Sequence, residues 1–391
     1  MRLKDVVILR NEKTTDTSKP YIALENIISW DAKYIESSIE TEGTNSVFKP
    51  NDILFGKLRP YLAKGFIPSY EGICSTEFFV LKAKKGYYTQ YLLYLLLSHS
   101  FIDYIKNQVA GVKMPRTNWE TFSSIEVSIP SLEVQQRIVE YLDAKTTEID
   151  KKIELLGKKR DAYNRLKTAT INRAVTRGLD EHVKLKDSGV EWIGKIPEHW
   201  EVKRFKSIFT ECKDVSTTGT EDLLSVSEYY GIARRTDKME DGEYETRAES
   251  LVGYKLCQKG DLVINIMLAW KRGLGISDYN GIVSPSYAVY RGRRIIPHYF
   301  HYLMRTDKYI AEYKRNSTGI IDSRLRLYTD KFNDIKAIVP PLSEQKQIAA
   351  YLDDCCAKID EAVTIIDKQI DALKRLKRSL INEVVTGKRK V

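Results

Sequence analysis

The sequence predicts a mixed α/β (α+β) chain in which two globular modules alternate with two long helices, with the second half repeating the first. The helical segment YLDAKTTEID at 141–150 recurs as YLDDCCAKID at 351–360, so the two copies lie 210 positions apart. Apolar residues recur at every seventh position in both copies, and strand-like runs bounded by Gly, Pro and Asn precede each copy. A repeat of this kind predicts two copies of one structural unit within one chain.

The duplicated segments read as two long coiled-coil helices. Each opens with Pro and a short polar step, which is typical of a helix start, and then carries two apolar positions per heptad. The predicted seam residues are Leu142, Ile149, Ile153, Leu156, Tyr163, Leu352, Ile359, Val363, Ile366, Ile370, Leu373 and Leu380. The seam breaks at Arg160, Lys167 and Lys377, where we expect poorer packing or a different partner surface.

Each helix has about 45 residues and would be roughly 65 to 70 Å long at 1.5 Å per residue. Such helices are not stable alone, so we expect them to pack on one another within the chain. The pattern leaves a parallel or an antiparallel pairing open.

The flanking modules repeat more faintly, with Asp52 aligned to Asp261. Each module continues with a helical pattern, at 89–107 and 298–316, a polar loop, and a last strand that leads into the long helix. The predicted boundaries are 1–128 for the first module, 129–178 for the first helix, 179–200 for a connector, 201–338 for the second module and 339–391 for the second helix.

Composition favours a polyanionic partner such as nucleic acid. The 391 residues include 63 Lys and Arg against 53 Asp and Glu, which gives a net charge of +10. The N-terminus lacks the apolar stretch of a secretory signal, and the most apolar run, YLLYLLL at 91–97, is too short to span a bilayer. Five scattered cysteines form no C-x-x-C pair and read as free thiols. We therefore expect a cytoplasmic protein without a membrane partner.

Motifs for chemistry are missing. No G-x-x-x-x-G-K-[ST] stretch is present to hold a nucleotide, and SPSY at 284–287 lacks the glycine-rich turn that a methyltransferase would need upstream. HYFH at 298–301 has metal-ligand spacing but no third ligand, so we interpret its histidines as surface residues. Asp353 and Asp354 read as first-turn acids that complement a helix dipole. We predict no catalytic residue and no metal site.

Basic and polar loops at equivalent places in the two modules are the candidate DNA contacts. Arg and Asn can hydrogen-bond base edges, whereas Lys mostly binds phosphate. The candidates are Lys57, Arg59, Tyr61, Lys64, Lys113, Arg116, Thr117 and Asn118 in the first module, and Lys271, Arg272, Ser317, Thr318, Ser323, Arg324 and Arg326 in the second, with Trp270 beside Lys271. Ordinary solvated loop charges are the alternative for each of these residues.

The duplicated P-x-L-x-x-Q, Y-L-D and I-D elements, the module order and DSGVEWIGKIPEHWEVKRFK at 187–206 resemble type I restriction-modification specificity (S) subunits. The resemblance covers essentially the whole chain. One departure concerns EWIG-x-IPEHW, which family members often carry at the N-terminus and which occurs here only in the middle. Residues 1–4 align instead with residues 203–206.

The resemblance implies two target recognition domains held apart by two long antiparallel helices, with pseudo-two-fold symmetry between the two halves. Each domain would read one half of a bipartite, asymmetric site on double-stranded DNA, and the helices would set the gap and dock two methylation subunits. Two restriction subunits would complete the complex, and the partners would use S-adenosylmethionine, ATP and Mg, with no cofactor in this chain. The alternatives are a coiled-coil scaffold or adaptor whose modules bind protein instead of DNA, and a self-contained methyltransferase, which would need the missing cofactor turn.

Overall fold

The chain forms two compact units, each with its own hydrophobic core. The computed structural model describes residues 1–37, 39, 41–108, 114–235 and 250–391. One unit comprises Met1–Lys159 with Ile366–Val391, and the other comprises Arg160–Ile365. Each unit therefore contains one module and one end of each long helix, and the core of each unit includes residues from both.

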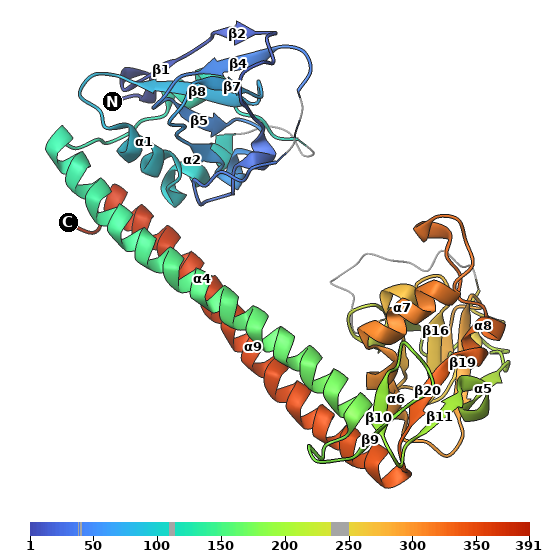
Figure 1. Cartoon of the computed structure of the whole chain (residues 1–391). Coiled ribbons are helices and arrows are strands. Elements are labelled where there is room, and N and C mark those ends of the chain that lie inside the picture. The colour runs from blue at the N-terminus through green and yellow to red at the C-terminus, as the bar shows by residue number, and fades with distance from the viewer. Residues whose placement is uncertain (38, 40, 109–113, 236–249) are drawn as a thin grey trace. The chain divides into compact units, whose positions relative to one another are not determined.

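The first module is built around a four-stranded antiparallel sheet (Figure 1). Both faces of this sheet are buried. Side chains alternate between the two faces along each strand. Phe55 and Leu81 pack with the helices of the module, and Leu54 and Val80 pack with a second sheet on the other face. The first sheet has the order β1 (Val7–Leu9), β8 (Phe78–Ala83), β5 (Ile53–Gly56) and β6 (Gly65–Phe66). The second has the order β2 (Lys13–Thr14), β4 (Asn45–Phe48), β7 (Gly72–Cys74) and β3 (Tyr21–Ile22). The helical elements are η1 (Leu3–Asp5), η2 (Leu24–Asn26), η3 (Pro60–Leu62), α1 (Thr89–Leu96), α2 (His99–Gln108) and α3 (Trp119–Ser124).

The second module repeats this sheet in the same order and register. Ile53 lies opposite Leu81 in the first module, and Leu262 lies opposite Tyr290 in the second. The repeated sheet has the order β12 (Phe209–Cys212), β19 (Tyr287–Gly292), β16 (Leu262–Asn265) and β17 (Leu274–Ile276). The remaining strands pair as β13 (Leu224–Ser227) with β14 (Gly231–Arg234) and β15 (Lys255–Cys257) with β18 (Gly281–Val283). The helical elements are α5 (Phe205–Ile208), η5 (Ala269–Lys271), α6 (Pro297–Met304), α7 (Asp307–Asn316), η6 (Asp322–Arg324) and α8 (Thr329–Asp334).

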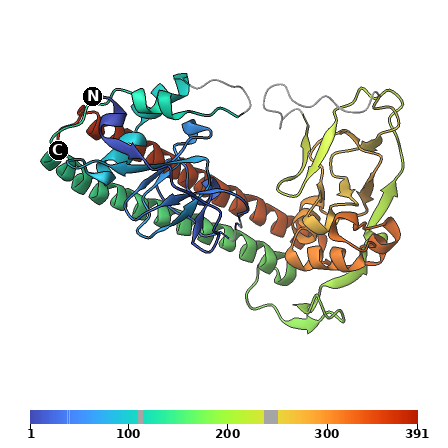
Figure 2. The ribbon, with the colours of Figure 1, turned by 90° about the horizontal axis from the view of Figure 1, so that it is seen from above.

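The connector folds as a hairpin on the second module (Figure 2, light green). Its strands are β9 (Leu185–Asp187) and β10 (Lys195–Pro197), after which β11 (Glu201–Arg204) pairs with β20 (Lys336–Val339). In the second module the amide of Phe205 then donates to the carbonyl of Ile335 at 3.0 Å. In the first module the amide of Leu3 donates to the carbonyl of Ile125 at 2.8 Å. These equivalent bonds confirm the alignment of residues 1–4 with residues 203–206.

The long helices α4 (Leu132–Arg177) and α9 (Leu342–Val385) pair antiparallel. In the first unit, Leu142 of α4 shares a core with Leu380 of α9. In the second unit, Val175 of α4 shares a core with Leu352 of α9. The start of one helix therefore packs against the end of the other, which resolves the choice that the heptads left open.

The predicted seam residues are all buried or half-buried. At two of the three seam breaks, Lys167 and Lys377 bind aspartates of the opposite helix. The prediction for Asp353 and Asp354 was wrong, because α9 begins at Leu342 and both residues lie beyond its first turn. Asp353 instead accepts a hydrogen bond from the hydroxyl of Tyr302 at 2.8 Å.

Duplicated polar contacts fix each module to the helix ends. Gln135 accepts from the amide of Tyr88 at 2.8 Å, and Gln345, 210 positions later, accepts from the amide of Ile296 at 2.9 Å. Both glutamine side chains are buried, and each also donates to a nearby proline carbonyl. A buried amide side chain must find hydrogen-bond partners. The bonds of Gln135 therefore fix where helix α1 begins relative to α4, and those of Gln345 fix where helix α6 begins relative to α9. No helix within the described ranges has the length and apolar character needed to cross a membrane.

Candidate nucleic-acid interface

A short 3-10 turn follows the central strand of each module and positions the first group of candidate residues. Helix η3 is followed by the capping residue Ala63 with φ 46°, and helix η5 by the capping residue Arg272 with φ 63°. The two residues are equivalent, and both adopt the left-handed conformation that non-glycine residues adopt at a cost. The turn is therefore a shared backbone scaffold, on which the two modules carry different side chains.

The two groups of candidate residues in each module come together in space. In the first module the amide of Thr117 donates to the carbonyl of Lys57 at 3.0 Å, and the amide of Arg59 donates to the carbonyl of Pro115 at 2.8 Å. In the second module the amide of Leu327 donates to the carbonyl of Ile266 at 2.8 Å. We call these joined segments the loop pairs, residues 57–64 with 114–118 and residues 266–273 with 317–328. Each loop pair presents one surface.

In the first loop pair, Arg59 and Tyr61 are exposed. Arg116 is also exposed, and its guanidinium lies 3.0 Å from Glu77, whose other carboxylate oxygen is buried without a hydrogen-bond partner among the described residues. Lys57 is half-buried with its ammonium 5.9 Å from the centre of the Phe79 ring. Burial lowers the pKa of Lys57, since desolvation disfavours its charged form.

Other first-module candidates are held by the fold. Lys64 donates to the carbonyl of Leu24 at 2.7 Å, and Thr117 is buried. Asn118 caps helix α3 by accepting from the amide of Thr121 at 2.8 Å. Lys113 lies outside the described residues.

In the second loop pair, the indole of Trp270 lies near two cations, one from the loop pair and one from helix α7. The ammonium groups of Lys271 and Lys314 lie 5.0 and 5.1 Å from the centre of the Trp270 ring. Arg272 points to the start of helix α7, where it donates to the carbonyl of Arg305 at 3.2 Å and binds Asp307. Its side chain therefore stabilises the module.

The remaining candidates lie on residues 317–326, which a bridge between Thr318 and Arg326 closes into a loop. Arg324 is exposed, and its side chain has no partner among the described residues. Ser323 is exposed beside it, while Ser317 donates to the carbonyl of Tyr313 at 2.7 Å. Arg326 bonds the carbonyl of Leu325 at 2.9 Å, which leaves part of its guanidinium available.

Sequence reasoning missed three features of these surfaces. Lys314 lies on helix α7 and reaches Trp270 only through the tertiary fold, and Glu77 reaches Arg116 in the same way. Ile320 is 100% exposed within the loop that the Thr318–Arg326 bridge closes, although an apolar residue is expected to be buried. No local sequence signal marks any of the three.

The two histidines of HYFH differ in environment. His298 is about half exposed and lies between Asp278 and Asp353, at 3.2 and 3.4 Å. His301 is half-buried rather than a surface residue as predicted, and its Nδ1 accepts from the amide of Ile276 at 3.3 Å. Burial, with the nearby charge of Arg305, lowers the pKa of His301 to about 3. Within the described ranges no group of three or more His, Cys, Asp or Glu side chains is arranged to hold a metal ion.

Comparisons with known proteins agree on one family. The model of the type I restriction modification DNA specificity domain matches residues 1–158 and 197–375. The specificity subunit of type I restriction enzyme MjaVIII from Methanocaldococcus jannaschii is 25% identical over 341 residues, which cover 82% of this chain and 75% of that protein. A solved structure from a study of complex assembly and conformational transition in the type I R-M system superposes with a TM-score of 0.73 at 18% identity, over 100% of this chain and 97% of its own. The HsdS subunit from Thermoanaerobacter tengcongensis gives a TM-score of 0.52 at 18% identity, over 100% of this chain and 96% of that subunit. The two structures share the fold of this chain.

Proposed function

This chain belongs to the type I restriction-modification DNA specificity family, and from that premise we propose that each of its modules reads one half of a bipartite, asymmetric DNA site. Specificity subunits of type I systems are non-catalytic, bind DNA and assemble with other subunits that carry out catalysis. The reading modules are residues 1–128 and 201–338, joined by the helical segments 129–178 and 339–391 and by the connector 179–200.

The observation that carries this proposal is the pair of equivalent loop pairs with unlike side chains. Arg59 is replaced by Leu268 at the equivalent position, and Met114 by Arg324. Base edges are distinguished by the donors and acceptors presented to them, so equivalent surfaces with different side chains favour different half-sites. A pair of identical loops would have favoured a palindrome.

The helix pair serves as spacer and as docking surface for two methylation subunits. Leu155 and Leu376 line one apolar depression on the helix pair in the first unit, and their side chains are 64% and 55% exposed. The residues at the duplicated positions in the second unit, Ile365 and Leu166, are 49% and 52% exposed. Large apolar side chains exposed on a helix pair favour a protein partner, and their duplication favours two copies of the same partner. Two restriction subunits, which use ATP, would complete the complex.

The test is to map adenine methylation across the genome of cells that express the cognate methylation subunit with and without this chain. A split, asymmetric methylated motif that appears only with the chain supports the proposal and gives both half-sites. An active methylation subunit that yields no such motif would favour the scaffold alternative, in which the modules bind protein.

A further inference from the structure

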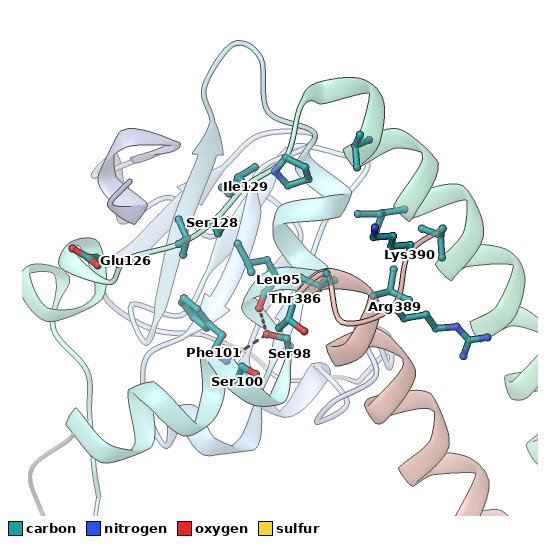
Figure 3. A pocket seen from close by; sticks show the side chains of 18 of the residues that line it. Leu95, Ser98, Ser100, Phe101, Glu126, Ser128, Ile129, Thr386, Arg389 and Lys390 are labelled. Atoms are coloured by element: carbon teal, nitrogen blue, oxygen red, sulfur yellow. Dashed lines mark hydrogen bonds between the residues drawn. The ribbon is translucent and has the colours of Figure 1, made fainter.

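A cavity of about 610 Å³ opens on the first unit beside the end of helix α9 (Figure 3). Its module side is formed by Phe101 of helix α2, by Ser128 and Ile129 before helix α4, and by Val134 within α4. Residues 384–387 and 389–391, at the end of α9 and beyond it, form the opposite side. We call this cavity the groove.

The equivalent surface of the second unit is covered by the chain's own hairpin. Trp200 is 0% exposed, and its indole nitrogen donates to Glu344 at 2.9 Å. Trp192 packs edge-on against Tyr309 at 4.9 Å between ring centres, and Lys308 donates to the carbonyl of Ile193 at 2.9 Å. The hairpin segment 185–200 therefore packs onto the rest of the second unit through two tryptophans.

The duplication shows that the groove is the same surface without its hairpin. Phe101 is the third residue of α2 and Tyr309 the third of α7, while Val134 and Glu344 are 210 positions apart. No described residue of the first unit lies where the hairpin lies in the second. The groove is therefore built to be covered by large apolar side chains, and a surface of this kind costs free energy when it stays in water.

The rim of the groove is basic. Arg137, Arg389 and Lys390 line it, and none of the three pairs with a carboxylate among the described residues. The corresponding residues of the second unit are Gln347, Leu179 and Asp180, so these three positive charges are not duplicated there. Glu126 is the one acid among the lining residues. An occupant with carboxylates would complement this rim.

We propose that the groove binds a segment of a partner protein that buries a tryptophan-sized side chain against Phe101 and Val134 and presents carboxylates to Arg137, Arg389 and Lys390. A second copy of this chain is a poor donor, because its own hairpin is already held by the buried Trp200. The inference goes beyond the reading of DNA, since it concerns a surface outside both loop pairs.

A synthetic peptide with the sequence of residues 187–200 is a suitable probe, because it carries both tryptophans and three carboxylates. We expect the labelled peptide to bind the full chain saturably, as measured by fluorescence anisotropy. Ser128→Trp fills the groove and should weaken binding by roughly tenfold or more. Ser124→Trp, on the exposed face of α3 outside the groove, is the matched control and should leave the affinity unchanged.

A second variant is expected to strengthen binding, a result that misfolding would not produce. Val134→Glu places a carboxylate where Glu344 accepts from Trp200 in the second unit. It should therefore tighten binding of the peptide, but not of the same peptide carrying Trp200→Ala. Amidation of the three peptide carboxylates should weaken binding, most strongly at low salt.

Absence of saturable binding, or equal affinity in Ser128→Trp, would overturn the proposal. Sedimentation adds a separate check on the occupant. A dimer of the parent chain that becomes a monomer in Ser128→Trp would overturn the assignment to a partner protein and place a second copy in the groove. A monomer for both the parent chain and Ser128→Trp supports the assignment of the groove to a partner protein.

Discussion

Lys377 of helix α9 donates to both carboxylate oxygens of Asp150 on helix α4, at 2.8 and 2.9 Å. The duplicated residues form the same contact in the other unit, where Lys167 lies 2.6 Å from Asp360. Each lysine interrupts an apolar seam and finds its partner one position after a seam isoleucine of the opposite helix. A polar pair within an apolar seam is satisfied in one register only, so we infer that these contacts fix the antiparallel register of the helices.

The two pairs should contribute unequally to stability. The Lys377 side chain is 10% exposed and also binds Asp31, whereas that of Lys167 is 30% exposed. Lys377→Met should lower the free energy of unfolding by about 1–3 kcal/mol, because it leaves two half-buried carboxylates short of a partner. Lys167→Met is the matched control and should cost about 0–1 kcal/mol. Urea denaturation of both variants measures the difference, and equal losses would contradict the argument from burial.

Stability should fall on acidification through Asp150. Burial acts to raise the pKa of Asp150, but hydrogen bonds from Lys33 and Lys377 outweigh it and hold the pKa below its ordinary value of 3.8. A carboxyl group with a lowered folded-state pKa stabilises the chain above its unfolded pKa and loses that contribution as pH falls through the folded value. Denaturation midpoints between about pH 5 and pH 3 should fall less steeply for Asp150→Asn than for the parent chain. Parallel slopes for the two would show that Asp150 is not responsible.

Arg324 is the side chain most available for base contact in the second loop pair. With the chain assembled with its methylation subunits, Arg324→Ala should weaken binding to one half-site by about 1–3 kcal/mol and leave the other half-site unaffected. Arg272→Ala is a control for structural damage, because that side chain binds Asp307 inside the module. Binding to DNA duplexes with each half-site altered in turn measures the effect. An equal loss on every sequence together with a smaller salt dependence would identify a phosphate contact instead.

Arg116 offers the corresponding test in the first module. Its contact with Glu77 holds the guanidinium in place. Arg116→Ala should therefore weaken recognition of one half-site, and this half-site should be the one that Arg324→Ala leaves unaffected. Glu77→Gln should retain the position of the arginine while removing the opposing charge, and should preserve the sequence preference. A variant of Arg116 that affects the same half-site as Arg324→Ala would contradict the assignment of one half-site to each module.

The proposed spacer role predicts a change in the gap between half-sites. Four residues inserted in α4 after Lys159 and four in α9 after Ile365 should lengthen the helix pair by about 6 Å. This corresponds to roughly two base pairs at 3.4 Å each, and methylation mapping would report the new gap. Four residues inserted after Thr386, beyond the end of α9, serve as control. An unchanged gap in the first variant would remove the spacer role.

The sequence by itself determined the parts that depend on local pattern and on repetition. The heptads of α4 and α9 place apolar residues on one helix stripe whatever the rest of the chain does, and the offset of 210 identified the two halves as one structural unit. The basic loops could be located in the same way, since their charge and position are visible along the chain.

Only the tertiary structure decided which residues those elements meet. The direction of the helix pair, the aspartates that receive Lys167 and Lys377, and the joining of two loops into one surface all depend on contacts between residues far apart in the sequence. The same holds for Lys64, Thr117 and Arg272, whose side chains are held within the fold, while Arg324 remains exposed. A residue type states what a side chain can bind, but burial and neighbouring atoms decide whether it is already bound.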